Sequence, residues 1–139
     1  MTTTIDQALT EMLRTQMPLA ATMKVDAVEA TSDRVVAAAN WQPAYCGAGG
    51  VLHGGYLMAL ADSTGAILAF LNLGPGDTTT TLESKTNFFR PATEGRVLAT
   101  STIVHQGQTT IVVQTDITNE TASLVSRTTQ TQAVLRPTA

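Results

Sequence analysis

The sequence predicts a single α+β domain in which a curved antiparallel sheet wraps around one long helix. Two features of the 139-residue chain carry this prediction. Residues 54–73 are apolar almost throughout, so a helix formed by them needs cover on nearly every side. The chain after residue 77 is rich in Thr, Val and Ile and is divided by short turns, which is typical of antiparallel strands. The length suits one domain, residues 1–139, with its own core.

The first part of the chain is predicted to form one helix, two short strands and a loop. Apolar residues recur at helical spacing from Ile5 to Leu13, which predicts a helix within residues 1–18 that ends at Pro18. Strands are expected over residues 23–30 and 34–40, followed by a glycine-rich loop over residues 41–52.

The central helix is expected over residues 54–73, where Gly74-Pro75-Gly76 ends it. Four strands should follow as a meander over residues 78–135, each antiparallel to the next because the turns are short. These strands are expected at residues 78–89, 96–105, 109–118 and 124–135. One Trp and three Phe are too few to seal both faces of such a sheet, so we expect a second subunit to cover part of it.

Composition and charge exclude several function classes. A net charge of −3 without clustered Lys or Arg argues against a nucleic-acid partner. Asp62 lies inside the central apolar run, where a mid-bilayer carboxylate costs about 2.5–3.5 kcal/mol, so the run is interpreted as a buried helix and no membrane partner is expected. The single Cys46 and the absence of signal-peptide blocks near Met1 indicate a cytoplasmic protein.

No cofactor and no metal ion are expected from the sequence. A glycine motif of the nucleotide-binding type is missing, so the sequence does not predict a bound nucleotide cofactor. His53 and His105 have no Cys or acidic residue at ligand spacing, so a metal site has little support.

The start of the central helix and a carboxylate within it are the features that predict chemistry. His53, Gly54 and Gly55 open the helix, whose first backbone N–H groups can hold a developing negative charge. The glycines allow a ligand to approach that backbone closely. Asp62 is the only formally charged residue between His53 and Gly76. A backbone that holds an oxyanion and a lone carboxylate are the parts of an acyl-transfer site, which predicts a hydrolase.

Helix geometry places the two parts too far apart to act together within one chain. Gly54 and Asp62 are eight residues apart, which is about 12 Å along a helix axis and about 80° around it. One small thioester or ester carbonyl cannot touch both. If both act on the same carbonyl, they come from different chains, and two antiparallel helices across a two-fold axis would form two equivalent sites. The spacing therefore predicts a homodimer with shared active sites.

The chain resembles the hotdog-fold acyl-CoA thioesterases of the phenylacetate-degradation type and similar thioesterase-superfamily proteins. The resemblance covers residues 22–134 and rests on three motifs: Leu52-His53-Gly54-Gly55, Leu60-Ala61-Asp62, and Asn87-Phe88-Phe89-Arg90-Pro91 followed by Gly95. It implies a hotdog fold, an acyl-CoA substrate, no bound cofactor, and assembly into dimers or tetramers.

The resemblance also implies roles for individual residues. Asp62 would be the nucleophile or the general base for water, the Gly54 N–H would polarise the thioester carbonyl, His53 would shape the loop, and Thr81 would help to position the water. Contacts with coenzyme A would come from Phe88, Arg90 and the turn residues His105, Gln106, Gly107 and Gln108. The loop before the helix and the helix itself would line the pocket, which makes Tyr45, Gly47, Gly55 and Met58 further candidates for substrate contact.

Two departures from the family pattern leave other functions open. Related enzymes often carry Asn or Gln six residues before the motif His, where this chain has Gly47, unless Asn40 or Gln42 takes that role. Basic residues common in the turn after residue 104 are also missing apart from His105. A non-catalytic acyl-CoA-binding or sensing module is therefore the main alternative. A hydratase ranks last, because the Asp and His that such enzymes pair on one loop are absent.

Each site residue also has a purely structural interpretation. Asp62 can be a buried carboxylate satisfied by nearby donors, and His53 can cap the helix. Thr81 can be an ordinary strand residue, and Arg90 a solvated strand end. The spacing of Asp62 from the His53-Gly54-Gly55 turn favours the catalytic interpretation.

Overall fold

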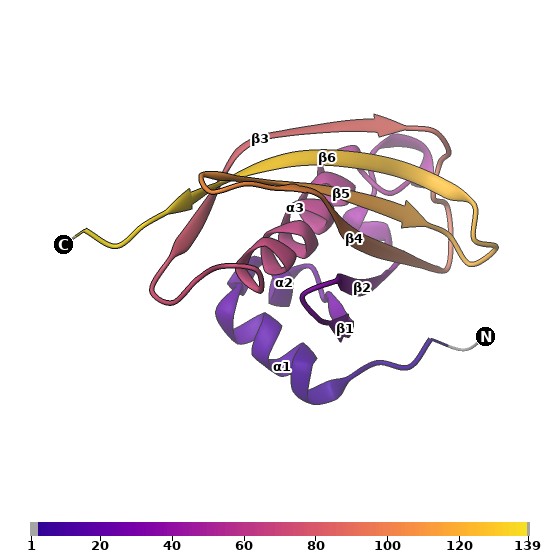
Figure 1. Ribbon diagram of the computed structural model, residues 1–139. Coiled ribbons are helices and arrows are strands. Elements are labelled where there is room, and N and C mark those ends of the chain that lie inside the picture. The colour runs from indigo at the N-terminus through magenta and orange to yellow at the C-terminus, as the bar shows by residue number, and fades with distance from the viewer. Residues whose placement is uncertain (1–2, 139) are drawn as a thin grey trace.

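The computed structural model describes residues 3–138 and contains one six-stranded antiparallel sheet that curves over a long helix (Figure 1). This arrangement confirms the predicted α+β fold class with a central helix. The helices and strands are α1 (Gln7–Gln16), α2 (Pro18–Thr22), β1 (Asp26–Ala30), β2 (Arg34–Asn40), α3 (Gly54–Phe70), β3 (Thr78–Phe88), β4 (Arg96–Gln106), β5 (Thr110–Thr118) and β6 (Leu124–Leu135). Two short 3₁₀ turns, Pro43–Tyr45 and Ala48–Gly50, lie in the loop before α3.

The order of strands across the sheet corrects the predicted four-strand meander. The order is β1-β2-β4-β5-β6-β3, so β4, β5 and β6 form a meander, but β3 pairs with β6. The physical reason is that β2 and β5 already occupy both edges of β4, which leaves the free edge of β6 for β3. The connection from β3 to β4 is short, but it does not form a hairpin: it passes the start of α3, where Leu52 N–H donates to Ala92 O.

The ends of two helices differ from the sequence prediction. Helix α3 ends at Phe70 instead of residue 73, and the Asn72 amide donates to Leu68 O at 2.8 Å and to Ser32 O at 2.9 Å. This side chain therefore satisfies one of the last helix carbonyls. Pro18 ends α1 as expected, but it also begins α2, because proline fits the first position of a helix.

Helix α3 is buried on the side that faces the sheet and partly exposed on the other. Leu57, Leu60, Ala61 and Leu68 are buried against the sheet. A second stripe along the helix stays partly or fully exposed, and we call it the open stripe of α3: Met58, Ala59, Asp62, Ser63, Ala66, Ile67 and Phe70.

Helix α1 lies on the side of the molecule away from β3, β5 and β6 (Figure 1). The side chains of β3 are exposed over most of its length, and Leu82 and Phe88 are exposed large apolar residues on it. Within residues 3–138, none of the helices is long and apolar enough to cross a lipid bilayer.

Candidate active site

The start of α3 presents one backbone donor that the fold does not use. His53 is the N-cap residue, and its Nδ1 accepts a hydrogen bond of 2.8 Å from the Gly55 N–H. Gly55 allows this contact, because a Cβ there would lie 2.9 Å from His53 Nδ1. The Gly54 N–H has no hydrogen-bond partner among residues 3–138. The predicted oxyanion donor is therefore free, and His53 has the capping role that was its structural interpretation.

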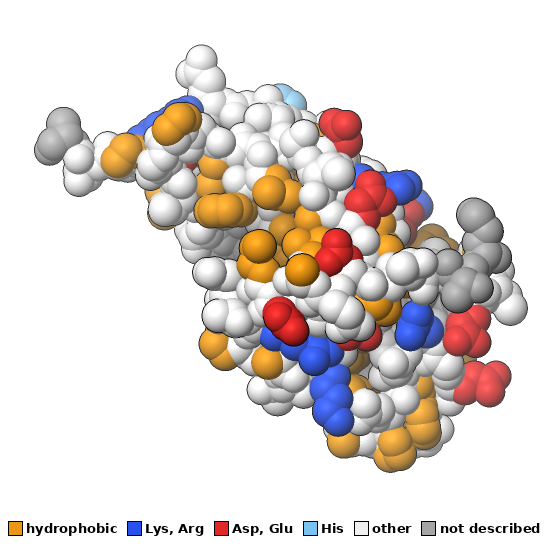
Figure 2. All heavy atoms as spheres, turned by 90° about the horizontal axis from the view of Figure 1, so that it is seen from below, with side chains coloured by type: hydrophobic (Ala, Val, Ile, Leu, Met, Phe, Trp, Pro, Cys, Tyr) orange, Lys and Arg blue, Asp and Glu red, His pale blue; other side chains and the backbone are white. Residues whose placement is uncertain are grey.

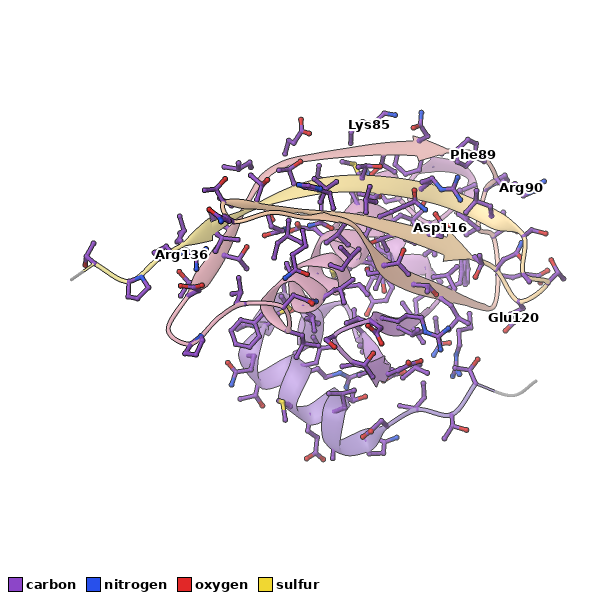
Figure 3. All side chains as sticks on the ribbon, viewed as in Figure 1. Lys85, Phe89, Arg90, Asp116, Glu120 and Arg136 are labelled. Atoms are coloured by element: carbon purple, nitrogen blue, oxygen red, sulfur yellow. The ribbon has the colours of Figure 1, made fainter. Side chains whose placement is uncertain are left out.

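A shallow hollow of about 390 Å³ surrounds this helix start. The Phe88 ring lies over Gly54, where an added Cβ would be 3.1 Å from the ring. Arg90 also lines the hollow and donates to Leu124 O at 3.0 Å. Figure 3 shows Phe89 and Arg90 at the end of β3. Gly54, Phe88 and Arg90 are thus brought together, as the sequence interpretation requires for a shared substrate contact.

Asp62 is half-buried, and only one of its two carboxylate oxygens is held by the fold. Oδ1 accepts hydrogen bonds from Thr81 Oγ1 at 3.0 Å and from Gln130 Nε2 at 2.9 Å. Oδ2 has no hydrogen-bond partner within the described part of the chain. The carboxylate is therefore held in orientation while one oxygen stays available to a substrate or a water molecule.

Gln130 is a site residue that the sequence analysis missed. Its side chain is fully buried and extends from β6 over α3, where a Cβ at Gly65 would lie 2.0 Å from Gln130 Oε1. The glycine therefore makes the space that Gln130 needs in order to reach Asp62. The signal for it in the sequence is weak, because both faces of β6 are polar and only the structure shows which face is buried: Ser126, Thr128, Gln130 and Gln132.

A chain of hydrogen bonds extends from Asp62 along β3. Thr81 Oγ1 donates to Asp62 and accepts from Gln132 Nε2 at 2.7 Å. Gln132 Oε1 in turn accepts from Thr79 Oγ1 at 3.1 Å. Thr81 is therefore more than a member of a Thr-rich strand, because its hydroxyl is oriented by one buried amide and directed at the carboxylate.

Several other residues named from the sequence lie away from Asp62. The ring of Tyr45 stacks on Tyr56 with centroids 4.6 Å apart, and its hydroxyl donates to Thr22 O. Burial of Tyr56 raises the pKa of its hydroxyl far above the usual value, and that hydroxyl donates to Met23 O at 2.9 Å. Tyr45 therefore connects the loop before α3 to α2, and Tyr56 connects α3 itself to the end of α2.

The β4–β5 turn lies at the opposite end of α3 from Gly54. Gln106 Nε2 donates to Asn72 O at 3.2 Å, and Gln108 O accepts from Arg136 at 2.7 Å. The imidazole of His105 lies over Gly107, where a Cβ would be 3.1 Å from Nε2. One protomer does not bring this turn next to the helix start, since residues 54 and 72 are about 27 Å apart along a helix axis.

Two positions bear on the departure at residue 47. Gly47 lies beside His53, and a Cβ added to it would be 3.5 Å from the ring, which is an ordinary contact. Asn40 is at the end of β2, where its Oδ1 accepts from Arg96 at 3.2 Å.

Met58 is on the open stripe, one helical turn before Asp62.

Comparisons with known proteins agree with this geometry. The family model named Thioesterase superfamily matches residues 49–126, which is more than half of the chain and includes the helix start and Asp62. A proposed esterase of Haemophilus influenzae is 40% identical over 71 residues, 51% of each chain, so the match spans about half the length of that relative. A proposed esterase of Saccharolobus solfataricus is 28% identical over 114 residues, 82% of this chain and 81% of the relative.

Solved structures are similar to this protein over most of the chain. A thioesterase from Haemophilus influenzae superposes with a TM-score of 0.86 at 26% identity, covering 98% of this chain and 93% of the other. The AziG protein of S. sahachiroi superposes with a TM-score of 0.83 at 29% identity, covering 86% and 98%. Fold, helix start and carboxylate together with the family match show that this chain belongs to the thioesterase superfamily.

Proposed function

We propose that the protein hydrolyses an acyl-CoA thioester to the free acid and coenzyme A in the cytoplasm, at two sites shared between the subunits of a homodimer. The observation that supports this proposal is the hydrogen bonding of the Asp62 carboxylate. One oxygen of its carboxylate is held by Thr81 and Gln130, the other is free, and the residue lies on the open stripe of α3.

The chemistry follows from the free oxygen. Asp62 Oδ2 takes a proton from water as the water oxygen bonds to the thioester carbonyl carbon. The C–S bond then breaks, and the coenzyme A thiolate receives the proton from Asp62. In the alternative route Oδ2 itself attacks the carbonyl carbon, and water hydrolyses the resulting anhydride. In both routes negative charge develops on the carbonyl oxygen.

The N–H of Gly54 of the partner subunit stabilises that charge in the proposed enzyme. The donor is free, it lies at a helix start, and the helix dipole adds to its effect. Within one protomer the same N–H is about 12 Å from Asp62 along the helix. The exposed strand β3 and the N-terminal part of the open stripe, Met58, Ala59, Asp62 and Ser63, supply surface for a second copy of the chain. The coenzyme A arm would leave through the hollow beside Phe88 and Arg90.

The first prediction concerns the carboxylate. Asp62→Asn keeps the shape of the side chain but removes the base, so thiol release from acyl-CoA should fall by about 10²–10⁴-fold. Thiol release is measured with a panel of aryl, short and medium acyl-CoA esters. Asp116→Asn is the matched control, because Asp116 pairs with Arg127 on a partly exposed part of the sheet and should leave turnover unchanged.

The same panel tests the alternative function. Gly47 stands where many relatives carry an amide side chain, which favours a module that binds acyl-CoA without hydrolysing it. Saturable binding with no thiol release from any ester would support that module and contradict the hydrolase. Release that persists in Asp62→Asn would contradict the role of the carboxylate.

A further inference from the structure

A long apolar groove lies between α1, strands β1 and β2, and the C-terminal half of α3. Its volume is about 530 Å³, and no charged side chain lines it within residues 3–138. Met12 on α1 and Phe70 on α3 line it and are 61% and 62% exposed. Figure 2, seen from below, shows apolar side chains gathered across the middle of this face. Two large exposed apolar residues beside an apolar hollow are typical of a binding site.

One end of the groove lies near Asp62. Ala66 lines the groove and lies one helical turn after Asp62 on the open stripe. Thr79 lines the groove from the sheet side, and its hydroxyl donates a hydrogen bond to Gln132. Gln132 also donates a hydrogen bond to Thr81, whose hydroxyl donates to Asp62. The groove therefore begins about one helical turn from the carboxylate and extends away from the helix start.

We propose that this groove holds the acyl chain of the substrate, and that the substrate is a medium-chain, uncharged acyl thioester. This inference rests on the proposed function and adds a substrate class to it. With the carbonyl at Asp62, the acyl chain runs over Ala66 toward Phe70 within one protomer. The thiol portion runs the other way, toward Gly54 of the partner subunit.

The length of the groove sets the length of the acyl chain. Asp62 and Leu71, the last α3-side residue of the groove, are nine residues apart, which is about 13.5 Å along a helix axis. An extended alkyl chain with bonds of about 1.5 Å advances roughly 1.25 Å per carbon. The path from Asp62 to the far end of the groove therefore accommodates about ten carbons beyond the carbonyl.

The lining also selects against charge. Gln16 and Thr79 are the polar side chains that line the groove, and neither can neutralise a carboxylate. A dicarboxylic acyl group such as succinyl would lose its hydration there without gaining an ion pair. The same argument favours saturated alkyl groups.

The test measures kcat/KM for butanoyl-, hexanoyl-, octanoyl-, decanoyl-, hexadecanoyl- and succinyl-CoA. In the wild type, kcat/KM should rise about fourfold per added methylene up to decanoyl, the factor that corresponds to about 0.8 kcal/mol for each buried CH₂. It should level off or fall at hexadecanoyl, and succinyl-CoA should be a poor substrate. A profile that is flat with chain length, or highest for succinyl, would overturn the proposal.

Variants of the lining locate the effect. Ala66→Phe fills the groove beside Asp62 and should move the optimum to shorter chains. Met12→Gln should lower the decanoyl-to-butanoyl ratio of kcat/KM several-fold. Leu19→Gln is the matched control, because Leu19 on α2 is 56% exposed but does not line the groove, and it should keep the wild-type profile.

A binding measurement separates failure of this proposal from failure of the hydrolase. Titration calorimetry of the Asp62→Asn variant should show that decanoyl-CoA binds more tightly than butanoyl-CoA. The double variant that also carries Ala66→Phe should lose this preference. If no ester is hydrolysed but this preference appears, the groove proposal stands without the hydrolase. If Met12→Gln changes the oligomeric state and not the chain-length profile, the groove is instead a contact between copies of the chain.

Discussion

At the scale of single residues, the position of the Asp62 carboxylate depends on the lack of a Cβ at Gly65. Gln130 can donate to Asp62 because Gly65 has no Cβ, which would otherwise lie 2.0 Å from Gln130 Oε1. Gln130 Oε1 itself has no partner within residues 3–138 although it is buried. An unpaired buried oxygen costs free energy, so the amide is held there at the expense of stability.

Gln130→Met and Gly65→Ala should therefore lower kcat more than they change KM. A hydrogen bond to a charged group contributes about 1.5–3 kcal/mol, so we expect a fall in kcat of roughly 10–100-fold. Steady-state kinetics with one good acyl-CoA substrate measures the effect. Gln114→Met on β5 is the control, because Gln114 has no side-chain hydrogen bond within residues 3–138. A change confined to KM would mean that Gln130 does not orient the carboxylate.

Tyr56 gives a pH dependence of stability. Its folded-state pKa is raised by burial, whereas the unfolded chain loses the same proton near pH 10. Above that pH the unfolded state binds fewer protons than the folded state, so the free energy of unfolding should fall as pH rises. Tyr56→Phe should remove part of this decline, although it loses the bond to Met23 O and about 1 kcal/mol at neutral pH. Urea unfolding between pH 8 and 11 compares the two slopes, and equal slopes would contradict the role of Tyr56.

The sequence was enough to select Asp62 and the Gly54 N–H as candidates, but it did not point to Gln130. Asp62 is visible because a lone acid in an apolar helix is unusual in itself. Gln130 lies in a Thr- and Gln-rich strand whose two faces look alike in composition, and its role depends on Gly65 across the domain. Residue contacts of this kind need the packing of strand on helix before they can be recognised.

At the scale of secondary-structure elements, the start of α3 allows a sharp test of the oxyanion donor. Gly54→Pro removes the N–H, and proline fits the first position of a helix after a residue such as His53 with an extended backbone. We expect a loss of about 10²–10³-fold in kcat. Gly54→Ala is the control, because it keeps the N–H and adds a Cβ 3.1 Å from the half-exposed Phe88 ring, which can move. Equal losses in the two variants would attribute the effect to space and not to the N–H.

Prediction from sequence worked for elements with strong local signals and failed where pairing is non-local. Three local patterns each predicted the structure of the segment in which they occur: the helical spacing in α1, the capping turn at His53, and the β propensity after residue 77. The partner of β3 was wrong, because a short connection favours a hairpin and nothing local shows that both edges of β4 are already taken.

At the scale of the whole molecule, shared sites can be tested by mixing two inactive proteins. Asp62→Asn and Gly54→Pro homodimers should each be nearly inactive. After unfolding and refolding together, about half of the dimers are mixed and each has one intact site, so about a quarter of the wild-type activity should return. Thiol release against mixing ratio measures this recovery. If each site were built from one chain, the mixture would stay as inactive as its components.

The position of β3 at the end of the sheet also determines when the site can form. Residues 78–88 are synthesised before residues 124–135, yet among the described strands β3 pairs only with β6. Thr81 and Gln130, which hold Asp62, therefore come together only after β6 has been synthesised. Contacts between such distant segments form late because closing long loops costs entropy first. The helix and its glycine turn belong to the early part of folding, and the orientation of the carboxylate is completed by the last strand.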